Sequence, residues 1–147
     1  VVVHRGADPR VIRLTIQVDG QEVGTFDADG SLVATPTGST AYALALGGPI
    51  VEPTLRNMVL VPVNPFALTV RPMVFSPTIA LQIGLARFRA ELTIDGRKVG
   101  RRMLGGDQLV VAGFDQALRV VRFGPAESFF QQVRQKLGWG TPLVPQT

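Results

Sequence analysis

The feature that most constrains the fold of this chain is the alternation of apolar and polar residues along several short segments. Ile12, Leu14, Ile16 and Val18 alternate with polar residues, and residues 88–94 repeat the pattern. Successive side chains of a β-strand point to opposite faces, so a period of two predicts strands that bury one face. Further strands are expected near residues 21–27, 58–63, 68–75, 79–84, 97–104, 108–113 and 117–123.

Turn residues separate these segments. Asp19-Gly20 and Asp95-Gly96 each precede a predicted strand. An Asp-Gly pair favours the two-residue turns of β-hairpins, because both central positions of such a turn need positive φ. We therefore predict a mainly β domain, built as a two-sheet, β-sandwich-like arrangement of about ten short strands.

A hydroxyl-rich turn follows a short apolar strand at residues 32–34. Ser39 or Thr40 can then cap a helix near residues 38–47 that ends at a glycine. The turn and the helix start offer backbone N–H groups and hydroxyls, which suit the polar edges of a nucleotide, and Tyr42 adds an aromatic face for stacking. An ordinary capped surface helix explains the same residues, so the local pattern alone leaves both interpretations open.

A second helix is predicted over residues 125–137, with Pro125 in its first turn and Gly138 as its end. The segment 141–147, which contains two prolines, is expected to be loose. The 147 residues, of which 46% are hydrophobic, are enough for one domain with a single core, which we place at residues 1–140.

Composition excludes several kinds of site. The chain has no cysteine, which rules out disulfides and thiolate metal sites. It has a single histidine, His4. We expect His4 to be a hydrogen-bonded structural residue of a first strand. No apolar run reaches the roughly 20 residues of a membrane helix. We therefore expect a cytoplasmic protein that has no membrane partner and binds no metal through this chain.

The net charge of +4 suits an anionic partner. Most basic residues are scattered, and the cluster of Arg97-Lys98 with Arg101 and Arg102 lacks the interleaved aromatic residues of a single-strand nucleic-acid binder. We expect no nucleic-acid partner. A solvated hairpin explains the cluster, and contact of Arg101 and Arg102 with the phosphates of a dinucleotide is the alternative.

Asp29-Gly30 together with residues 35–50 resembles the signature of the C-terminal domain of NAD kinases. The resemblance spans nearly the whole chain, because it continues through Pro62-Val63-Asn64-Pro65, Arg71-Pro72-Met73-Val74, Phe129-Phe130 and Lys136-Leu137-Gly138-Trp139. Residues 1–6 are similar to the family segment that follows an Asn-Glu pair. That pair is not present and Val1 is not a methionine, so we expect this chain to be part of a longer protein.

The resemblance implies that the chain binds NAD. Asp29 matches a dinucleotide contact that the family often offers to a neighbouring subunit, where it accepts a hydrogen bond from the nicotinamide amide. The family positions that hold the adenine and nicotinamide groups match Thr37, Thr40, Ala41 and Tyr42.

Two further matches are weaker. Ala45 stands where some relatives provide a hydroxyl, which an alanine removes. Asn64 is carried over for its backbone, because Phe66 stands in this loop where relatives often have a histidine.

Gly105-Gly106-Asp107 resembles the start of the family's Gly-Gly-Asp-Gly motif, whose aspartate is proposed to accept the proton of the ribose 2′-hydroxyl. The residues after Asp107 predict a strand, so we interpret this segment as a hairpin turn. The family's motif belongs to the preceding domain. We therefore expect no catalytic residue in this chain.

The resemblance implies that the intact protein transfers a phosphoryl group from ATP or polyphosphate to the 2′-hydroxyl of NAD, giving NADP. A divalent metal such as Mg²⁺ would accompany ATP. An N-terminal α/β domain, absent here, would supply the base and the phosphate loop, so this chain alone is expected to be inactive. The expected assembly is a homodimer or homotetramer.

Two alternatives stay open. A stand-alone dinucleotide-binding or regulatory module would share the site without catalysis, and the residues upstream of Val1 distinguish it from a kinase. A lipid kinase relative would share the architecture, but the intact run from Thr35 to Ile50 speaks against it.

Overall fold

The computed structural model describes residues 1–114, 121, 123 and 128–140. The chain divides into two compact units, residues 1–115 and 116–147, and each is described by itself. Every strand of the described residues belongs to the first unit, and the helix α2 (Phe129–Leu137) belongs to the second.

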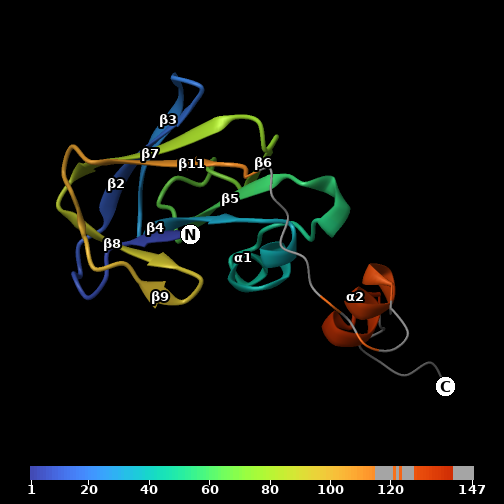
Figure 1. The fold of residues 1–147 in the computed structure, drawn as a ribbon. Coiled ribbons are helices and arrows are strands. Elements are labelled where there is room, and N and C mark those ends of the chain that lie inside the picture. Colours follow the sequence, from blue (N-terminus) through green and yellow to red (C-terminus); the bar gives the residue numbers. More distant parts are fainter. Residues whose placement is uncertain (115–120, 122, 124–127, 141–147) are drawn as a thin grey trace. The chain divides into compact units, whose positions relative to one another are not determined.

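Two antiparallel sheets make up the first unit (Figure 1). The larger sheet contains β1 (Val2–His4), β4 (Gly30–Ala34), β5 (Met58–Val63), β6 (Met73–Phe75), β8 (Arg89–Ile94), β9 (Arg97–Lys98) and β10 (Met103–Leu104). Its order is β10-β8-β1-β4-β5-β6, and β9 pairs with β8. The smaller sheet has the order β11-β7-β2-β3 and contains β2 (Ile12–Val18), β3 (Gln21–Ala28), β7 (Ala80–Arg87) and β11 (Gln108–Ala112). The prediction of a mainly β, two-sheet fold is confirmed.

The Asp-Gly pairs form the predicted turns. Asp19 and Gly20 join β2 to β3 with φ values of 48° and 81°. Asp95 and Gly96 join β8 to β9 with φ values of 46° and 77°. Positive φ at both central residues is the conformation of a type I′ hairpin turn, which Asp-Gly pairs favour. The two turns therefore form for the reason that the sequence indicated.

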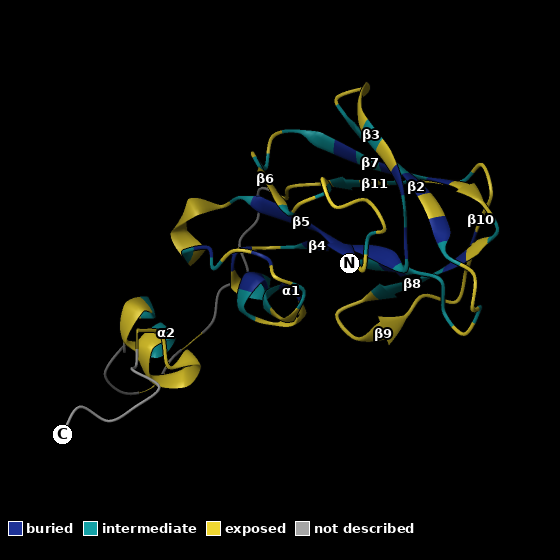
Figure 2. Cartoon of the chain, turned by 180° about the vertical axis from the view of Figure 1, so that it is seen from behind, coloured by how far each residue is buried: buried dark blue, intermediate teal, exposed yellow. Residues whose placement is uncertain are grey.

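The main core lies between the two sheets. Ile12, Leu14 and Ile16 of β2 are at most 2% exposed, as their alternation predicted, and they join one apolar cluster with residues of the larger sheet such as Val3 and Ala90. Figure 2 shows these buried segments in the middle of the first unit.

A second apolar cluster lies on the other face of the larger sheet. It contains Leu32, Ala43, Val51, Val59 and Val61. Because β5 is covered on both faces, all of its residues are buried and its sequence is apolar throughout. Pro62 fits this strand because β6 pairs only with Met58–Leu60, which leaves Pro62 opposite Ser31 alone.

Two predicted strands are shorter than expected. The segment 97–104 forms β9 and β10 separately, because the chain bends at Gly100 and Arg101 while both strands pair with β8. Of the segment 68–75, only Met73–Phe75 pairs with a neighbour. The strand predicted at 117–123 lies outside the described residues, apart from isolated positions.

The helices also differ from the prediction. The helix expected near 38–47 is two short pieces, the 3₁₀-helix η1 (Thr37–Thr40) and α1 (Tyr42–Ala45). A further 3₁₀-helix, η2 (Pro53–Leu55), precedes β5. None of the described helices has the length and apolar character needed to cross a membrane.

The C-terminal helix α2 begins at Phe129 and not at residue 125. Ser128 is its N-cap: the Ser128 hydroxyl accepts from the Gln131 N–H, and the Gln131 side chain accepts from the Ser128 N–H. This reciprocal cap sets the helix start, so the prediction of a start at Pro125, which lies outside the described residues, was wrong. Gly138, with φ of 63°, ends the helix as predicted.

Candidate functional site

A cavity of about 680 Å³ opens on the face of the larger sheet that carries α1. Its floor is apolar and includes Leu32 and Ala34, which alternate with the core-facing Val33 on β4. Its polar lining is contributed by the end of β1, the start of β4, the η1–α1 segment, the end of β5 and the β8–β9 turn: His4, Arg5, Asp29, Tyr42, Asn64, Thr93 and Asp95.

The cavity is shaped by a close approach of β1 to β4. Gly30 pairs with His4, and a Cβ at Gly30 would lie 3.0 Å from His4 Cα and would collide with the Val3 carbonyl oxygen. A glycine is therefore needed at this position. The approach brings Arg5, which follows β1, next to Asp29, which precedes β4.

Asp29 is held from two sides. Arg5 Nε donates to Asp29 Oδ1 at 2.7 Å, and Asn64 Nδ2 donates to Asp29 Oδ2 at 3.0 Å. These hydrogen bonds, that of Asn64 first, lower the pKa of Asp29 below 3.8, against the opposing effect of burial. Asp29 is therefore a fixed, ionised acceptor at neutral pH.

The backbone explains how Asn64 reaches this carboxylate. Asn64 has φ of 46°, a left-handed conformation that asparagine tolerates better than most residues. The Asp29 N–H donates to the Val63 carbonyl oxygen at 3.0 Å, which fixes the end of β5 against the start of β4. The side chain of Asn64, and not only its backbone as the resemblance suggested, takes part in the site.

The wall formed by η1 and α1 is built without the predicted caps. Neither helix has a side-chain hydrogen bond at its N-cap, so the prediction that Ser39 or Thr40 caps a helix was wrong. The buried Ser39 hydroxyl instead donates to the Pro36 carbonyl at 2.6 Å and accepts from the Val51 N–H at 3.0 Å. These two hydrogen bonds tie the η1 segment to the chain at Val51. Tyr42, at the start of α1, is half-exposed and lines the cavity.

His4 is a hydrogen-bonded residue, as predicted. Its Nδ1 accepts from the Gly6 N–H at 3.1 Å, and its Nε2 lies 3.4 Å from Thr93 Oγ1. An Nδ1 that accepts places the proton of the neutral ring on Nε2, where it can be donated to Thr93. His4 also lines the cavity.

The structure brings together some of the predicted site residues. Asp29, Ala41, Tyr42 and Asn64 line the cavity, whereas Thr37, Thr40 and Ala45 belong to the same helical segments but are not among its lining residues.

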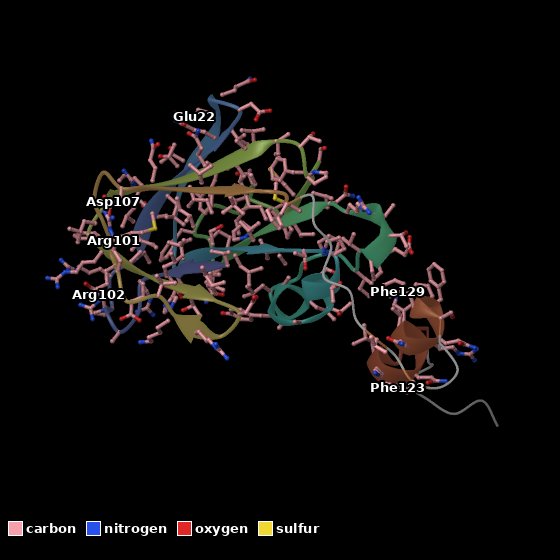
Figure 3. The ribbon with its side chains drawn as sticks, viewed as in Figure 1. Glu22, Arg101, Arg102, Asp107, Phe123 and Phe129 are labelled. Atoms are coloured by element: carbon pink, nitrogen blue, oxygen red, sulfur yellow. The ribbon has the colours of Figure 1, made fainter. Side chains whose placement is uncertain are left out.

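Arg101 and Arg102 are not at the cavity. Figure 3 shows both side chains directed outward near Asp107, well away from α1. Arg102 Nη2 lies 3.8 Å from the Glu91 carboxylate.

Sequence reasoning missed Arg5, Thr93 and Asp95 as lining residues. Asp95 was interpreted only as turn chemistry, and it forms that turn while also facing the cavity. The position of Arg5 follows from the register of β1 against β4, which the sequence pattern does not supply.

Asp107 belongs to a turn, as predicted, but not to a hairpin. Its carboxylate accepts from the Leu104 N–H at 2.9 Å, and its own N–H donates to the Leu104 carbonyl at 2.9 Å. The strands on either side, β10 and β11, pair with β8 and β7 in different sheets. The turn therefore carries the chain from one sheet to the other.

Metal ligands do not gather at the cavity. Within the ranges that the structure describes, no group of three or more His, Asp or Glu side chains is arranged to hold a metal ion. The cavity lining contains two carboxylates, those of Asp29 and Asp95. A carboxylate can accept hydrogen bonds from a ligand or pair with a cationic group of it.

Comparison with known proteins assigns this chain and its fold to one family. The model of the ATP-NAD kinase C-terminal domain matches residues 1–123. The NAD kinase of Gemmatimonas aurantiaca is 41% identical over 142 residues, which are 95% of this chain and 48% of that protein. The NAD kinase of Halorhodospira halophila is 41% identical over 145 residues, which are 97% of this chain and 47% of that protein.

Solved structures agree with this assignment. The crystal structure of yeast NADH kinase complexed with NADH matches with a TM-score of 0.88 and 26% identity, over 99% of this chain and 45% of that chain. An NAD kinase from Archaeoglobus fulgidus in complex with ATP matches with a TM-score of 0.67 and 30% identity, over 78% of this chain and 44% of that chain. The chain spans about half the length of the curated relatives it matches. The predicted resemblance is confirmed, and the chain belongs to the ATP-NAD kinase C-terminal domain family.

Proposed function

We propose that this chain is the NAD-binding part of an enzyme that phosphorylates the 2′-hydroxyl of NAD to give NADP. The observation that carries the proposal is the cavity in which Asp29, fixed by Arg5 and Asn64, and the half-exposed ring of Tyr42 line one space. An ionised acceptor and an aromatic face are the two features that an amide-bearing, base-containing ligand needs.

Each residue has a distinct proposed role. Asp29 accepts a hydrogen bond from the nicotinamide amide, and Tyr42 stacks on a base. Ala41 and Asn64 shape the wall around them, and Thr37, Thr40 and Ala45 support the helical segments that carry Tyr42. These groups bind and orient the dinucleotide, which is the main requirement of phosphoryl transfer once the donor is in place.

The reacting groups are proposed to lie outside this chain. The base that accepts the 2′-hydroxyl proton and the loop that holds the phosphates of ATP or polyphosphate belong to an N-terminal domain. When ATP is the donor, a divalent metal such as Mg²⁺ offsets the charge of its phosphates. The chain by itself is then inactive, with residues 1–140 as its functional domain, and the enzyme acts in the cytoplasm.

The assembly is proposed to be a homodimer or homotetramer. Asp29 and Tyr42 of one chain already line the same cavity, and Asp29 is proposed to lie near Tyr42 of a neighbouring chain as well. Light scattering of the intact protein gives the oligomeric state. An intact protein that is a monomer with full NAD affinity contradicts the shared site.

The test of the proposed function is an assay of the intact gene product with NAD and either ATP or polyphosphate. We expect NADP to form, and we expect Asp29→Asn to weaken NAD binding while the protein stays folded. A protein that binds NAD tightly but forms no NADP with either donor is the stand-alone binding module instead. A protein that does not bind NAD contradicts both.

A further inference from the structure

Asp95 is a cavity-lining carboxylate that the proposed function leaves without a role. It occupies the first central position of the β8–β9 turn, with φ of 46°, and Gly96 follows with φ of 77°. Among the described residues, Asp95 makes no ion pair, whereas Asp29 is bound by Arg5 and Asn64. The oxygens of Asp95 therefore remain able to accept hydrogen bonds from a ligand.

Asp29 and Asp95 lie at opposite ends of the cavity. The Arg5 N–H donates to the Asp29 carbonyl oxygen just after β1, and Val2, at the start of β1, pairs with Thr93 of the antiparallel β8. Because β8 continues past Thr93, Asp95 lies beyond the start of β1. It is about five residues from the level of Arg5, which is about 17 Å along the strand direction and suits an extended dinucleotide.

Small residues form the end of the cavity at Asp95. The start of the chain lies between β4 and β8 (Figure 1), and the register of both strands with β1 places Ala34 at the level of Asp95. Gly38 lies against Ala34, since a Cβ on Gly38 would be 3.5 Å from that of Ala34. Gly38 and Gly96 carry no side chain, so this end offers a flat ring small residues and backbone, with the Asp95 carboxylate beside them.

The chemistry of this end selects a base that carries an exocyclic amine. In the proposed function, on which this inference rests, the nicotinamide lies at Asp29, so the adenine of an extended dinucleotide reaches the other end of the cavity. The amino group at C6 of adenine donates hydrogen bonds, and a carboxylate only accepts them. We propose that Asp95 accepts a hydrogen bond from this amino group and thereby discriminates adenine from bases that carry a carbonyl oxygen at C6.

The test compares three dinucleotides in calorimetric titrations of the intact protein, without a phosphoryl donor. NAD is the reference. Nicotinamide hypoxanthine dinucleotide has a carbonyl oxygen in place of the adenine amine, and nicotinic acid adenine dinucleotide has a carboxylate in place of the nicotinamide amide.

The variant is Asp95→Asn, and Asp29→Asn, at the other end of the cavity, is its matched control. Asn-Gly favours the same type of turn as Asp-Gly, so Asp95→Asn should keep the β8–β9 turn. Thermal melts confirm that both variants are folded.

We expect the parent to bind the hypoxanthine dinucleotide about tenfold or more weakly than NAD, because its carbonyl oxygen would face the oxygens of Asp95. The side-chain amide introduced by Asp95→Asn can turn its oxygen toward an amine or its NH₂ group toward a carbonyl, so the difference should shrink to about threefold or less. Asp29→Asn should keep the difference of the parent. It should instead improve the binding of the nicotinic acid dinucleotide relative to NAD, because that carboxylate no longer faces Asp29.

Three results overturn the role of Asp95 and leave the proposed function standing. They are equal affinity of the parent for NAD and the hypoxanthine dinucleotide, an undiminished difference between the two in Asp95→Asn, and an equally diminished difference in Asp29→Asn, which would mean that net charge discriminates. A parent that binds none of the three dinucleotides contradicts the proposed function itself, and the role of Asp95 with it.

Discussion

Arg5 and Asp29 form an ion pair in which Arg5 Nε lies 2.7 Å from Asp29 Oδ1. The antiparallel pairing of His4 with Gly30 makes these residues neighbours. A second nitrogen of the Arg5 guanidinium group donates to the Asp8 carbonyl oxygen, so two hydrogen bonds fix the orientation of this group. An aspartate that is already oriented needs no rearrangement to accept a hydrogen bond from a ligand, which favours binding.

The same pair predicts a response to acid. The pKa of Asp29 is lowered from 3.8 by the hydrogen bond from Asn64 and by Arg5. A carboxyl whose pKa is lower in the folded state contributes stability above its unfolded pKa, and this is lost as the pH falls through the folded pKa. We expect Asp29→Asn to flatten the loss of stability below about pH 4, as measured by urea melts.

Asp29→Asn melts that keep the slope of the parent below about pH 4 would show that the lowered pKa of Asp29 does not contribute to stability.

Tyr42 distinguishes a binding residue from a core residue. Its side chain is 50% exposed, so Tyr42→Ala leaves no large cavity and should change the free energy of unfolding by less than about 1 kcal/mol. Loss of stacking should raise the dissociation constant of NAD by roughly 5- to 150-fold in the intact protein. Tyr42→Phe keeps the ring and should bind nearly as well.

Calorimetric titration with NAD beside a urea melt separates these effects. Unchanged affinity for NAD in Tyr42→Ala rejects the stacking role. A drop in stability of roughly 3–5 kcal/mol instead identifies Tyr42 as a packing residue.

Local signals in the sequence predicted the strands and turns well, because their causes are local. The alternation on β2 and the Asp-Gly turns require only neighbouring residues and their φ values. Asp29 and Tyr42 were expected in the site only through their resemblance to a family pattern, and the structure places both at one cavity. Arg5 was missed because it contacts Asp29 through strand pairing across 24 residues.

The errors in the helices have a similar cause. Ser39 has the right residue type for a cap, but its hydroxyl is used by the Val51 N–H, which is 12 positions away. Ser128 was overlooked as a cap because Pro125 also suits a first helical turn, and only the reciprocal bonds with Gln131 decide between them. Tertiary contacts and competing caps are thus what the sequence pattern leaves undetermined.

Gly30→Ala should disturb both stability and the cavity. The added methyl group would collide with the Val3 carbonyl oxygen between two paired strands, and backbone cannot yield as a flexible side chain does. We expect a loss of about 1–3 kcal/mol or more, measured by urea unfolding, together with weaker binding of NAD. Gly24→Ala is the matched control, since a Cβ there meets nothing within 4 Å and its φ is not positive. Similar losses in both variants would show that a methyl group is unfavourable at either strand position and that the close approach at Gly30 is not responsible, because the lower entropy of the unfolded chain in Gly→Ala variants favours folding.

The two buried serines predict opposite effects for one substitution. Ser31 and Ser39 are both fully buried, at 0% exposure. Ser39 Oγ makes two hydrogen bonds, one of them from the Val51 N–H. Ser31 Oγ has no hydrogen-bond partner among the described residues, and Ser31 shares the core-facing side of β4 with Val33.

Removing a satisfied hydroxyl leaves a buried N–H without a partner, which costs about 1–3 kcal/mol, so Ser39→Ala should be destabilised by that amount. Removing an unsatisfied hydroxyl relieves a desolvation penalty, so Ser31→Ala should keep its stability or gain up to about 1 kcal/mol. Urea unfolding of the two variants beside the parent gives both values. A loss of stability in Ser31→Ala comparable to that in Ser39→Ala would show that the Ser31 hydroxyl is hydrogen-bonded in solution, and the core between the two sheets would then contain a polar contact.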